Sequence, residues 1–430
     1  MRILLIHQFY LRSGEGGGSR FNEMVRLWQE RGHEVKVLAG QVSYTSGARP
    51  KEARTFWREE GQHGEEVYRL YTPETYQRGV LGRAWSVGGF AASALSYLTF
   101  RQRKFTQWAD AMIVTSPPLT LGVVPWWVKR SRGALPVVFE VRDLWPESAV
   151  ATGALREGTM LLEALYRLEE LAYRHADRIV ALTPAIAEDI ARRGLARREH
   201  IHIIPNGADD AMLSPLSDVS QEQIARTRDR LGWGKDQFVV LYAGAHGMAN
   251  DLMQMVDAAT LAARDETLRD HVVWALIGDG PQKKGLMEEA KRRGLENIRW
   301  HDGVGRAEIQ QVFDAADCGA AILRRTETFK TVYPNKIFDA MSRGKPVVCG
   351  VDGAARMLVE QSSTGVYFEP GDAEQFVHAV RHLHEDRRRA AAYGERGRAL
   401  IERDFARRDL ARRYEALLQE IASKRGIAHS

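Results

Sequence analysis

Glycine-rich loops follow three of the short apolar runs in this sequence, and charged side chains stand beside them. Without a Cβ atom, glycine lets backbone N–H groups approach a ligand closely, and a helix that starts there favours negative charge. We therefore expect these loops to bind a phosphate or a sugar, and a flexible linker is the alternative for the first. The glycines are Gly17 and Gly18 in GEGGGSR, Gly244 and Gly247 in YAGAHGM, and Gly278 and Gly280 in IGDGP.

Cations accompany the second and third loops. Lys283 lies in the predicted first turn of the helix after IGDGP, where a cation opposes the helix dipole and suggests an anionic ligand. His246 lies within YAGAHGM and is placed to donate to a phosphate, although a lone histidine is more often structural. These residue types indicate a site for an anionic group.

The stretch TVYPNKIFDAM, residues 331–341, carries an unusually polar helix start. Asn335 is expected to cap the helix. Asp339 follows it by four residues, so the two share one face. A carboxylate at this place suits a pair of ribose hydroxyls, and Lys330 and Lys336 would neutralise a leaving diphosphate.

Arg142 and Asp143 end the apolar run VVFEVRD, just before the turn LWP. Two explanations stand beside each other. The pair forms a local ion pair, or both side chains face a binding cleft.

The elements that must position these residues alternate between short β-branched runs and amphipathic helical stretches. This rhythm predicts α/β architecture with parallel sheets covered on both faces. The 430 residues exceed what one hydrophobic core usually supports. The rhythm pauses after residue 214, so we predict two domains, 1–214 and 215–395, and a helical segment, 396–430, that packs back toward the first. Ligands of open parallel sheets bind at the strands' carboxyl ends, which predicts a cleft lined by both domains.

The order of these motifs resembles that of the family 4 glycosyltransferases over nearly the whole chain. The stretches that carry the resemblance are GEGGG, RGHEVKVL, ADRIVALTPAIAEDI, IPNGADD, VVLYAG, IGDGP, KIFDAMSRGKPVV and GVYFEPGD. VRDLWPES, YAGAHGMAN and FKTVYPNKIFDAM are most similar to the bacterial subgroup of amino-sugar transferases that builds O-antigen, capsule and exopolysaccharide.

The resemblance implies the GT-B fold, in which two Rossmann-like domains face each other across a cleft. The N-terminal domain would bind the acceptor and the C-terminal domain the nucleotide-sugar. It implies catalytic roles for Arg142, Asp143, His246 and Lys330. The implied donor-binding residues are Gly17, Gly18, Gly244, Gly247, Gly278, Gly280, Lys283, Val304, Thr331, Val332, Asn335, Lys336 and Asp339.

The implied reaction is a retaining transfer of a sugar, an N-acetylated hexosamine in this subgroup, from a UDP-sugar to a polyprenyl-diphosphate-linked saccharide. No cofactor and no metal are expected, and the sequence has no Asp-x-Asp motif. Two alternatives stay open. One is a non-hydrolysing UDP-N-acetylglucosamine 2-epimerase, and the other is a non-catalytic nucleotide-sugar-binding partner in a polysaccharide assembly complex.

The sequence departs from the family pattern at three places. Thr331 and Asp339 occupy positions where the family commonly has two glutamates, so the carboxylate near the sugar is missing. Ala245 replaces an arginine that often contacts the diphosphate, and no lysine follows before Asp251. Arg142 stands where many members have a histidine.

A basic and aromatic zone in the N-terminal half suggests contact with an anionic membrane surface. Its residues are Arg83, Arg101, Arg103, Lys104, Trp126, Trp127, Lys129 and Arg130. The alternative is a core helix, Ala84 to Phe100, with solvated ends. The net charge of +5 comes without a nucleic-acid-binding motif, so no nucleic acid partner is expected. Two cysteines outside any CxxC unit and the lack of a signal-peptide pattern predict a cytoplasmic protein, and the basic and aromatic zone predicts that it is peripheral on the cytoplasmic face of the inner membrane.

Overall fold

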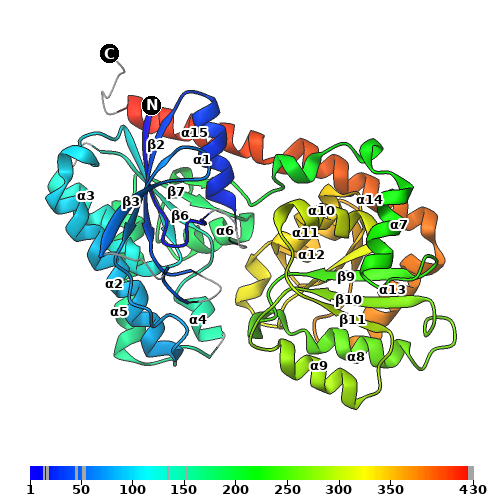
Figure 1. Cartoon of the computed structure of the whole chain (residues 1–430). Coiled ribbons are helices and arrows are strands. Elements are labelled where there is room, and N and C mark those ends of the chain that lie inside the picture. The colour runs from blue at the N-terminus through cyan, green and yellow to red at the C-terminus, as the bar shows by residue number, and fades with distance from the viewer. Residues whose placement is uncertain are drawn as a thin grey trace. The chain divides into compact units, whose positions relative to one another are not determined.

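The chain forms two compact units in a computed structural model (Figure 1). The structure describes residues 1–12, 15, 19–43, 47–50, 55–132, 135–151 and 153–424. Unit 1 comprises Met1–Pro205 and Arg408–Ser430, and unit 2 comprises Asn206–Arg407. The sequence predicts these junctions at 215 and 396, whereas the two compact units divide at 206 and 408.

Unit 1 is built on an eight-stranded sheet in the order β3-β4-β2-β1-β5-β6-β7-β8. Every pairing is parallel except that of β3 with β4. The central strand β1 is buried from its second residue onward, as expected for a parallel strand covered on both faces. The strands are β1 (Arg2–Ile6), β2 (Glu34–Gly40), β3 (Phe56–Glu60), β4 (Glu66–Leu70), β5 (Ala111–Ser116), β6 (Val137–Val141), β7 (Arg178–Ala181) and β8 (Ile201–Ile203).

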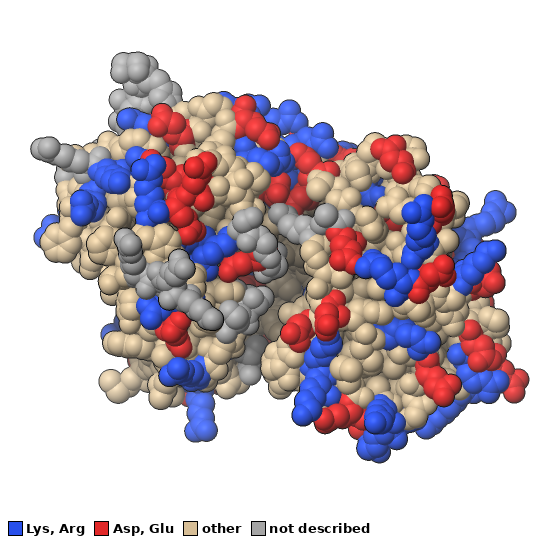
Figure 2. All heavy atoms as spheres, in the orientation of Figure 1, with Lys and Arg blue, Asp and Glu red and all other residues tan. Residues whose placement is uncertain are grey.

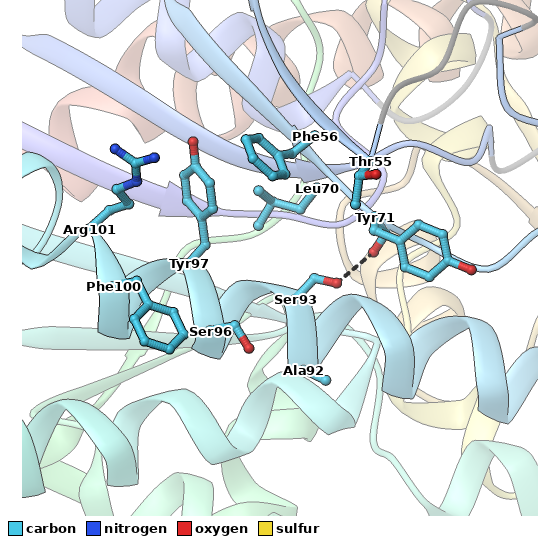
Figure 3. A pocket seen from close by; sticks show the side chains of 10 residues that line it. All are labelled: Thr55, Phe56, Leu70, Tyr71, Ala92, Ser93, Ser96, Tyr97, Phe100 and Arg101. Carbon is cyan, nitrogen blue, oxygen red and sulfur yellow. Dashed lines mark hydrogen bonds between the residues drawn. The ribbon is translucent and has the colours of Figure 1, made fainter.

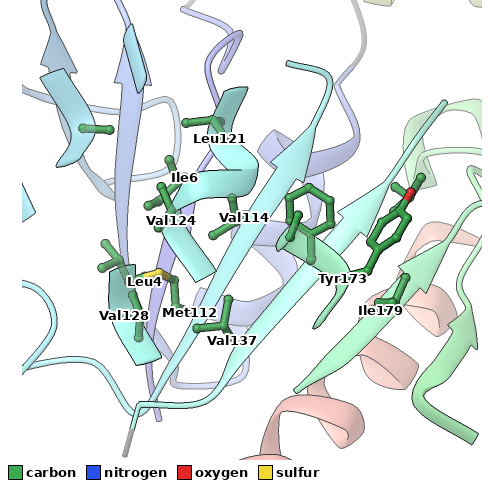
Figure 4. Packing of buried hydrophobic residues seen from close by; sticks show 14 of the residues in the cluster. Leu4, Ile6, Met112, Val114, Leu121, Val124, Val128, Val137, Tyr173 and Ile179 are labelled. Carbon is green, nitrogen blue, oxygen red and sulfur yellow. The ribbon is translucent and has the colours of Figure 1, made fainter. Parts of the chain in front are cut away.

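Helices cover both faces of this sheet. On one face, α2 (Gly79–Phe100), α3 (Val123–Arg132), α5 (Met160–His175) and α6 (Pro184–Arg192) pack over a core shown in Figure 4. On the other face lie α1 (Arg20–Glu30) and the C-terminal helix α15 (Arg407–Ser423). The indole N–H of Trp28 donates to the carbonyl of Ala411 at 3.1 Å, so α1 holds α15 by a buried hydrogen bond as well as by apolar packing. A short helix, α4 (Glu147–Ala151), follows β6.

Unit 2 contains a six-stranded sheet, entirely parallel, in the order β11-β10-β9-β12-β13-β14. The strands are β9 (Phe238–Ala243), β10 (Val272–Ile277), β11 (Ile298–His301), β12 (Cys318–Ile322), β13 (Val347–Gly350) and β14 (Gly365–Tyr367). The helices are α7 (Gln221–Arg230), α8 (Met253–Ala262), α9 (Lys283–Arg292), α10 (Arg306–Ala315), α11 (Asn335–Ser342), α12 (Ala354–Gln361), α13 (Ala373–Glu385) and α14 (Arg387–Leu400). The prediction of two α/β halves with parallel sheets is confirmed.

The helix starts follow simple local rules. Thr183 precedes α6, and its hydroxyl accepts from the amide of Ile186 at 3.1 Å, with Pro184 at the first helical position. Asp372 caps α13 in the same way, through the amide of Gln375 at 2.9 Å. Because all strands except β3 run parallel within their sheets, the loops that follow them gather at one edge, where the functional residues are to be sought.

Candidate functional site

The loops after β9 and β10 interlock at the carboxyl edge of the unit 2 sheet. The amide of His246 donates to the carbonyl of Asp279 at 2.8 Å, and the amide of Gln282 donates back to the carbonyl of His246 at 3.0 Å. Gly280 has φ 157°, and a Cβ there would lie 2.6 Å from the oxygen of His246. A side chain at this position would push the two turns apart, so glycine is required for the loop geometry.

The ring of His246 is enclosed by this arrangement. The residue is 0% exposed, and neither ring nitrogen has a hydrogen-bond partner in the described part of the chain. Burial, followed by the neighbouring Lys283, lowers its pKa to about 4. At neutral pH the ring is therefore uncharged, and it brings no positive charge to a phosphate. Its predicted catalytic role stays a prediction.

Lys336, in the first turn of α11, stands over the β9 loop. Its ammonium lies 4.8 Å from the centre of the Tyr242 ring, and a Cβ on Gly244 would come within 2.7 Å of its Cε. The lysine therefore occupies space that only glycine leaves open. Burial lowers the pKa of Lys336 to about 8, while Asp339 acts in the opposite direction. A cation with this pKa is charged at neutral pH and held in a poorly solvated place.

Lys283 begins α9, as predicted, but its charge has a partner. Its ammonium lies 2.6 Å from a carboxylate oxygen of Asp302 and 3.1 Å from the carbonyl of His301. Asp302 is 99% exposed, so the pair can open toward solvent at little cost. Both residues line a cavity of about 700 Å³ together with Asp279, Gly280 and Trp300. Val304, in the loop after β11, is half-buried against the core.

The segment before α11 differs from the expectation in one respect. The helix begins at Asn335 itself, with Pro334 in the cap position and no side-chain cap, so the prediction that Asn335 caps it is wrong. The proline fixes the chain in an extended conformation just before the first turn, and the Asn335 side chain is left exposed. Asp339 lies one turn further on the same face as Asn335.

Thr331 and Lys330 lie in a short 3-10 turn, Thr328–Thr331, that leads to this segment. The Thr331 hydroxyl donates to the carbonyl of Thr328 at 2.8 Å, while the neighbouring Val332 is half-buried. The Lys330 ammonium lies 2.8 Å from Glu327 and 3.6 Å from Asp352. Lys330 is therefore already neutralised locally, and the structure brings Lys336 rather than Lys330 to the glycine turns.

At the carboxyl edge of the unit 1 sheet, Arg142 and Asp143 follow β6. The described residues show no direct ion pair between them, which removes the simpler explanation for their adjacency. Burial raises the pKa of the Asp143 carboxyl, opposed by the charge of Arg142. His7, which follows β1 at the same edge, was not predicted from the sequence; a histidine that ends an otherwise apolar run was the available signal. Gly17 and Gly18 lie outside the described residues.

A groove of about 430 Å³ lies between α2 and the β3–β4 hairpin of unit 1 (Figure 3). Its walls include Phe56, Tyr71, Tyr97 and Phe100, and Arg101 stands at one end. Ser93 donates to the carbonyl of Tyr71 at 3.0 Å and joins the two walls. The groove thus combines an aromatic lining with one cationic end.

The predicted basic and aromatic zone divides into exposed and engaged residues. Arg83, Arg101, Lys104, Trp126 and Arg130 are exposed, and the side chain of Arg103 lies outside the described part. Trp127 packs against the core, and Lys129 forms an ion pair with Asp177 at 2.6 Å. Apolar side chains at the start of α2 are also exposed, among them Leu81 at 83% and Trp85 at 68%. Figure 2 shows acidic and basic side chains intermixed over the visible faces of both units.

Among the residues with described positions, no three His, Cys, Asp or Glu side chains group closely enough to hold a metal ion. Within the same residues, no helix has the length and apolar character needed to cross a membrane.

Comparison with known families gives two matches along the chain. Residues 15–207 match the glycosyl transferase 4-like domain, and residues 237–386 match the glycosyl transferases group 1. The two matches fall on the two predicted halves in the predicted order.

Individual relatives extend over most of the chain. WcaI of Escherichia coli, named as a colanic acid biosynthesis glycosyl transferase, is 24% identical over 391 residues, 89% of this chain and 91% of that protein. A D-inositol 3-phosphate glycosyltransferase of Xylanimonas cellulosilytica is 27% identical over 398 residues, 91% of this chain and 89% of its own. The structure of Anabaena HepE with UDP and glucose superposes with a TM-score of 0.70 at 22% identity, covering 98% of this chain and 100% of HepE. The predicted GT-B fold is confirmed.

Proposed function

Since the chain belongs to the glycosyl transferase 4-like and group 1 glycosyltransferases, we propose that it is a retaining, metal-independent hexosyltransferase of cell-surface polysaccharide assembly. The donor is a UDP-sugar, with an N-acetylated hexosamine as the sugar transferred. The acceptor is a polyprenyl-diphosphate-linked saccharide. WcaI, named as a colanic acid biosynthesis glycosyl transferase, supports this choice of pathway class.

One observation carries the donor part of the proposal. Lys336 stands over the glycine turn after β9, with a lowered pKa and with Asp339 one turn further along the same helix. In this arrangement the ammonium and the loop amides stabilise the departing diphosphate, and Asp339 accepts from the ribose hydroxyls. The reaction proceeds by front-face attack, in which the leaving phosphate helps to deprotonate the acceptor hydroxyl.

The acceptor part rests on unit 1. The groove between α2 and the β3–β4 hairpin offers an aromatic wall to a prenyl chain, and Arg101 offers a charge to the anionic membrane surface. Exposed Leu81 and Trp85 at the start of α2 suit contact with a bilayer surface. We therefore place the protein on the cytoplasmic face of the inner membrane as a peripheral protein.

The proposal is tested by incubating the chain with UDP-, GDP- and dTDP-sugars and a lipid-linked acceptor. Transfer from a UDP-sugar supports it, and the absence of both turnover and nucleotide binding would refute it.

Incubation with the UDP-sugar alone distinguishes the epimerase alternative, because NMR would then detect an epimerised sugar. Nucleotide binding without turnover of any donor would favour the non-catalytic partner, for which the missing carboxylate at Thr331 is the supporting feature. Co-sedimentation with anionic vesicles tests the membrane contact. Loss of vesicle binding in the double variant Leu81→Ser, Trp85→Ser would support it.

A further inference from the structure

Three polar side chains end adjacent strands at the carboxyl edge of the unit 1 sheet. His7 follows β1, Thr115 lies near the end of β5, and Arg142 follows β6. The pairing of Ile6 with Val114 and of Ser116 with Val141 sets these strands side by side, and the amide of Arg142 donates to the carbonyl of Ser116 at 2.9 Å. Two strand spacings are about 10 Å, which a histidine and an arginine side chain bridge easily.

The three side chains also share a face. Side chains alternate between the two faces of a strand, so residues two apart point the same way. Two residues before each of them lies a side chain that packs or pairs on the α1 side: Leu5, Ile113 and Glu140. The His7 ring is 5.2 Å from the ring of Phe21 on α1. His7, Thr115 and Arg142 therefore form one cluster beside α1.

The hydrogen bonds of this cluster favour one tautomer of His7. The Thr115 hydroxyl donates to the carbonyl of Ile6 at 3.4 Å and so presents a lone pair to Nδ1 of His7 at 2.8 Å. Nδ1 then carries the proton, and Nε2 carries a lone pair with no partner among the described residues. Burial, and after it the charges of Arg142 and Arg20, lower the pKa of His7 well below its usual value. The ring therefore stays a neutral hydrogen-bond acceptor at neutral pH.

The positive charge of the cluster resides on Arg142. The two other cations near His7 are neutralised, Arg20 by Glu140 at 3.0 Å and Arg69 by Glu59 at 2.7 Å. Arg142 has no such ion pair within the described residues, and its Nε is buried without a hydrogen-bond partner. A half-buried guanidinium left in this state favours an anion more strongly than a solvated one does.

We propose that His7 and Arg142 form a subsite for an acceptor that carries a hydroxyl close to a phosphate. Nε2 of His7 accepts a hydrogen bond from a sugar hydroxyl, and the guanidinium of Arg142 binds the phosphate. The subsite rests on the acceptor role proposed for unit 1, and it gives that role two residues and a substrate class. Thr115 is a positioning residue, because it holds the histidine in the tautomer that leaves Nε2 free to accept.

Two small probes separate the two contacts. N-acetylglucosamine 1-phosphate carries hydroxyls and a phosphate on a six-membered ring, whereas cyclohexyl phosphate carries the phosphate alone. Ligand-observed NMR titrations of the full chain, with UDP at saturation to fill the donor site, give an affinity for each probe. We expect the wild type to prefer the sugar phosphate. Arg142→Gln should weaken the binding of both probes about tenfold or more, whereas Arg197→Gln, a change at an exposed arginine elsewhere in unit 1, should leave both affinities unchanged.

Substitutions of His7 test the hydroxyl contact. His7→Asn keeps a donor to Thr115 but removes the acceptor at Nε2, so the preference for the sugar phosphate should vanish while cyclohexyl phosphate binds as before. His7→Gln places an amide oxygen near the Nε2 position and should restore part of the preference. Equal wild-type affinities for the two probes, or affinities that Arg142→Gln leaves unchanged, would overturn the proposal. UDP binding, measured in the same samples, reports separately on the proposed donor function and on the fold of each variant.

Discussion

Lys336 gives the clearest quantitative expectation, because its charge depends on pH in an accessible range. With a pKa of about 8, roughly nine-tenths of the side chain is protonated at pH 7 and roughly one-tenth at pH 9. Burial lowers the pKa, so the cation is present below pH 8 and is lost as the pH rises through 8. If the ammonium stabilises the leaving diphosphate, kcat/KM for the donor should fall about tenfold between pH 7 and pH 9.

Two variants of Lys336 make this expectation specific. Lys336→Arg keeps a charge at all these pH values, so the decline toward pH 9 should disappear even if the rate at pH 7 is reduced. Lys336→Met removes the charge. Loss of a hydrogen bond to a charged group costs about 1.5–3 kcal/mol, which corresponds to a roughly 10- to 150-fold loss of kcat/KM at pH 7. The methionine variant should also show no inflection near pH 8.

The assay is UDP release at saturating acceptor and low donor, from pH 6 to pH 9.5, at constant ionic strength. Glu169 in unit 1 is buried, and its pKa is raised to about 7 by desolvation. An inflection caused by Glu169 would lie near pH 7 and would survive the arginine substitution, so the two groups can be told apart. A flat wild-type profile between pH 7 and pH 9, or the same inflection in Lys336→Arg, would refute the reasoning.

Three further outcomes follow from the geometry of unit 2. Asp339→Ala should weaken UDP binding about tenfold in calorimetry, whereas Asp270→Ala, a change at an exposed aspartate of unit 2, should leave it unchanged. An unchanged affinity in Asp339→Ala would show that Asp339 does not bind the ribose. Gly280→Ala should lower the affinity for UDP, because the added Cβ would lie 2.6 Å from the carbonyl oxygen of His246. The control Gly285→Ala adds a Cβ that meets nothing within 4 Å, and it should raise the free energy of unfolding by about 1 kcal/mol. Arg343→Met breaks a buried pair with Asp314, 2.8 Å apart, and should lower the free energy of unfolding by about 3–5 kcal/mol in denaturant titrations; a loss below 1 kcal/mol would contradict this.

The fold was accessible from the sequence because most strands of both sheets are continuous apolar runs. A parallel strand covered on both faces must be apolar, and β10 shows this along its whole length and β1 from its second residue onward. The hairpin of β3 and β4 was missed for the opposite reason. Strand β3 pairs antiparallel with β4 at the edge of the sheet, and its sequence FWREE exposes every second residue. This alternation is a weaker hydrophobic signal than the continuous apolar runs of the buried strands.

The candidate site was accessible only in part. Loop position follows from strand order, so the glycines after β9 and β10 and the polar start of α11 could be placed together. The burial, charge and ion pairing of the side chains could not be predicted. His246 is enclosed and neutral, Lys330 is paired with Glu327, and Lys129 is paired with Asp177. These outcomes depend on contacts between residues far apart in sequence, which spacing alone does not report. His7 was overlooked because it sits in a run that reads as a buried strand.

The cation above the β9 turn comes from α11 rather than from the loop itself, where Ala245 stands. This origin has a thermodynamic consequence, because a diphosphate bound beside Lys336 restores the favourable environment that burial removes. UDP binding should therefore raise the pKa of Lys336 from about 8 and take up about half a proton per site at pH 8. The phosphates of UDP are already ionised there, so they contribute little. Calorimetry of UDP binding at pH 8, in buffers of different ionisation enthalpy, measures this uptake. It should vanish in Lys336→Arg, and a wild type that takes up no proton would show that the diphosphate does not lie beside Lys336.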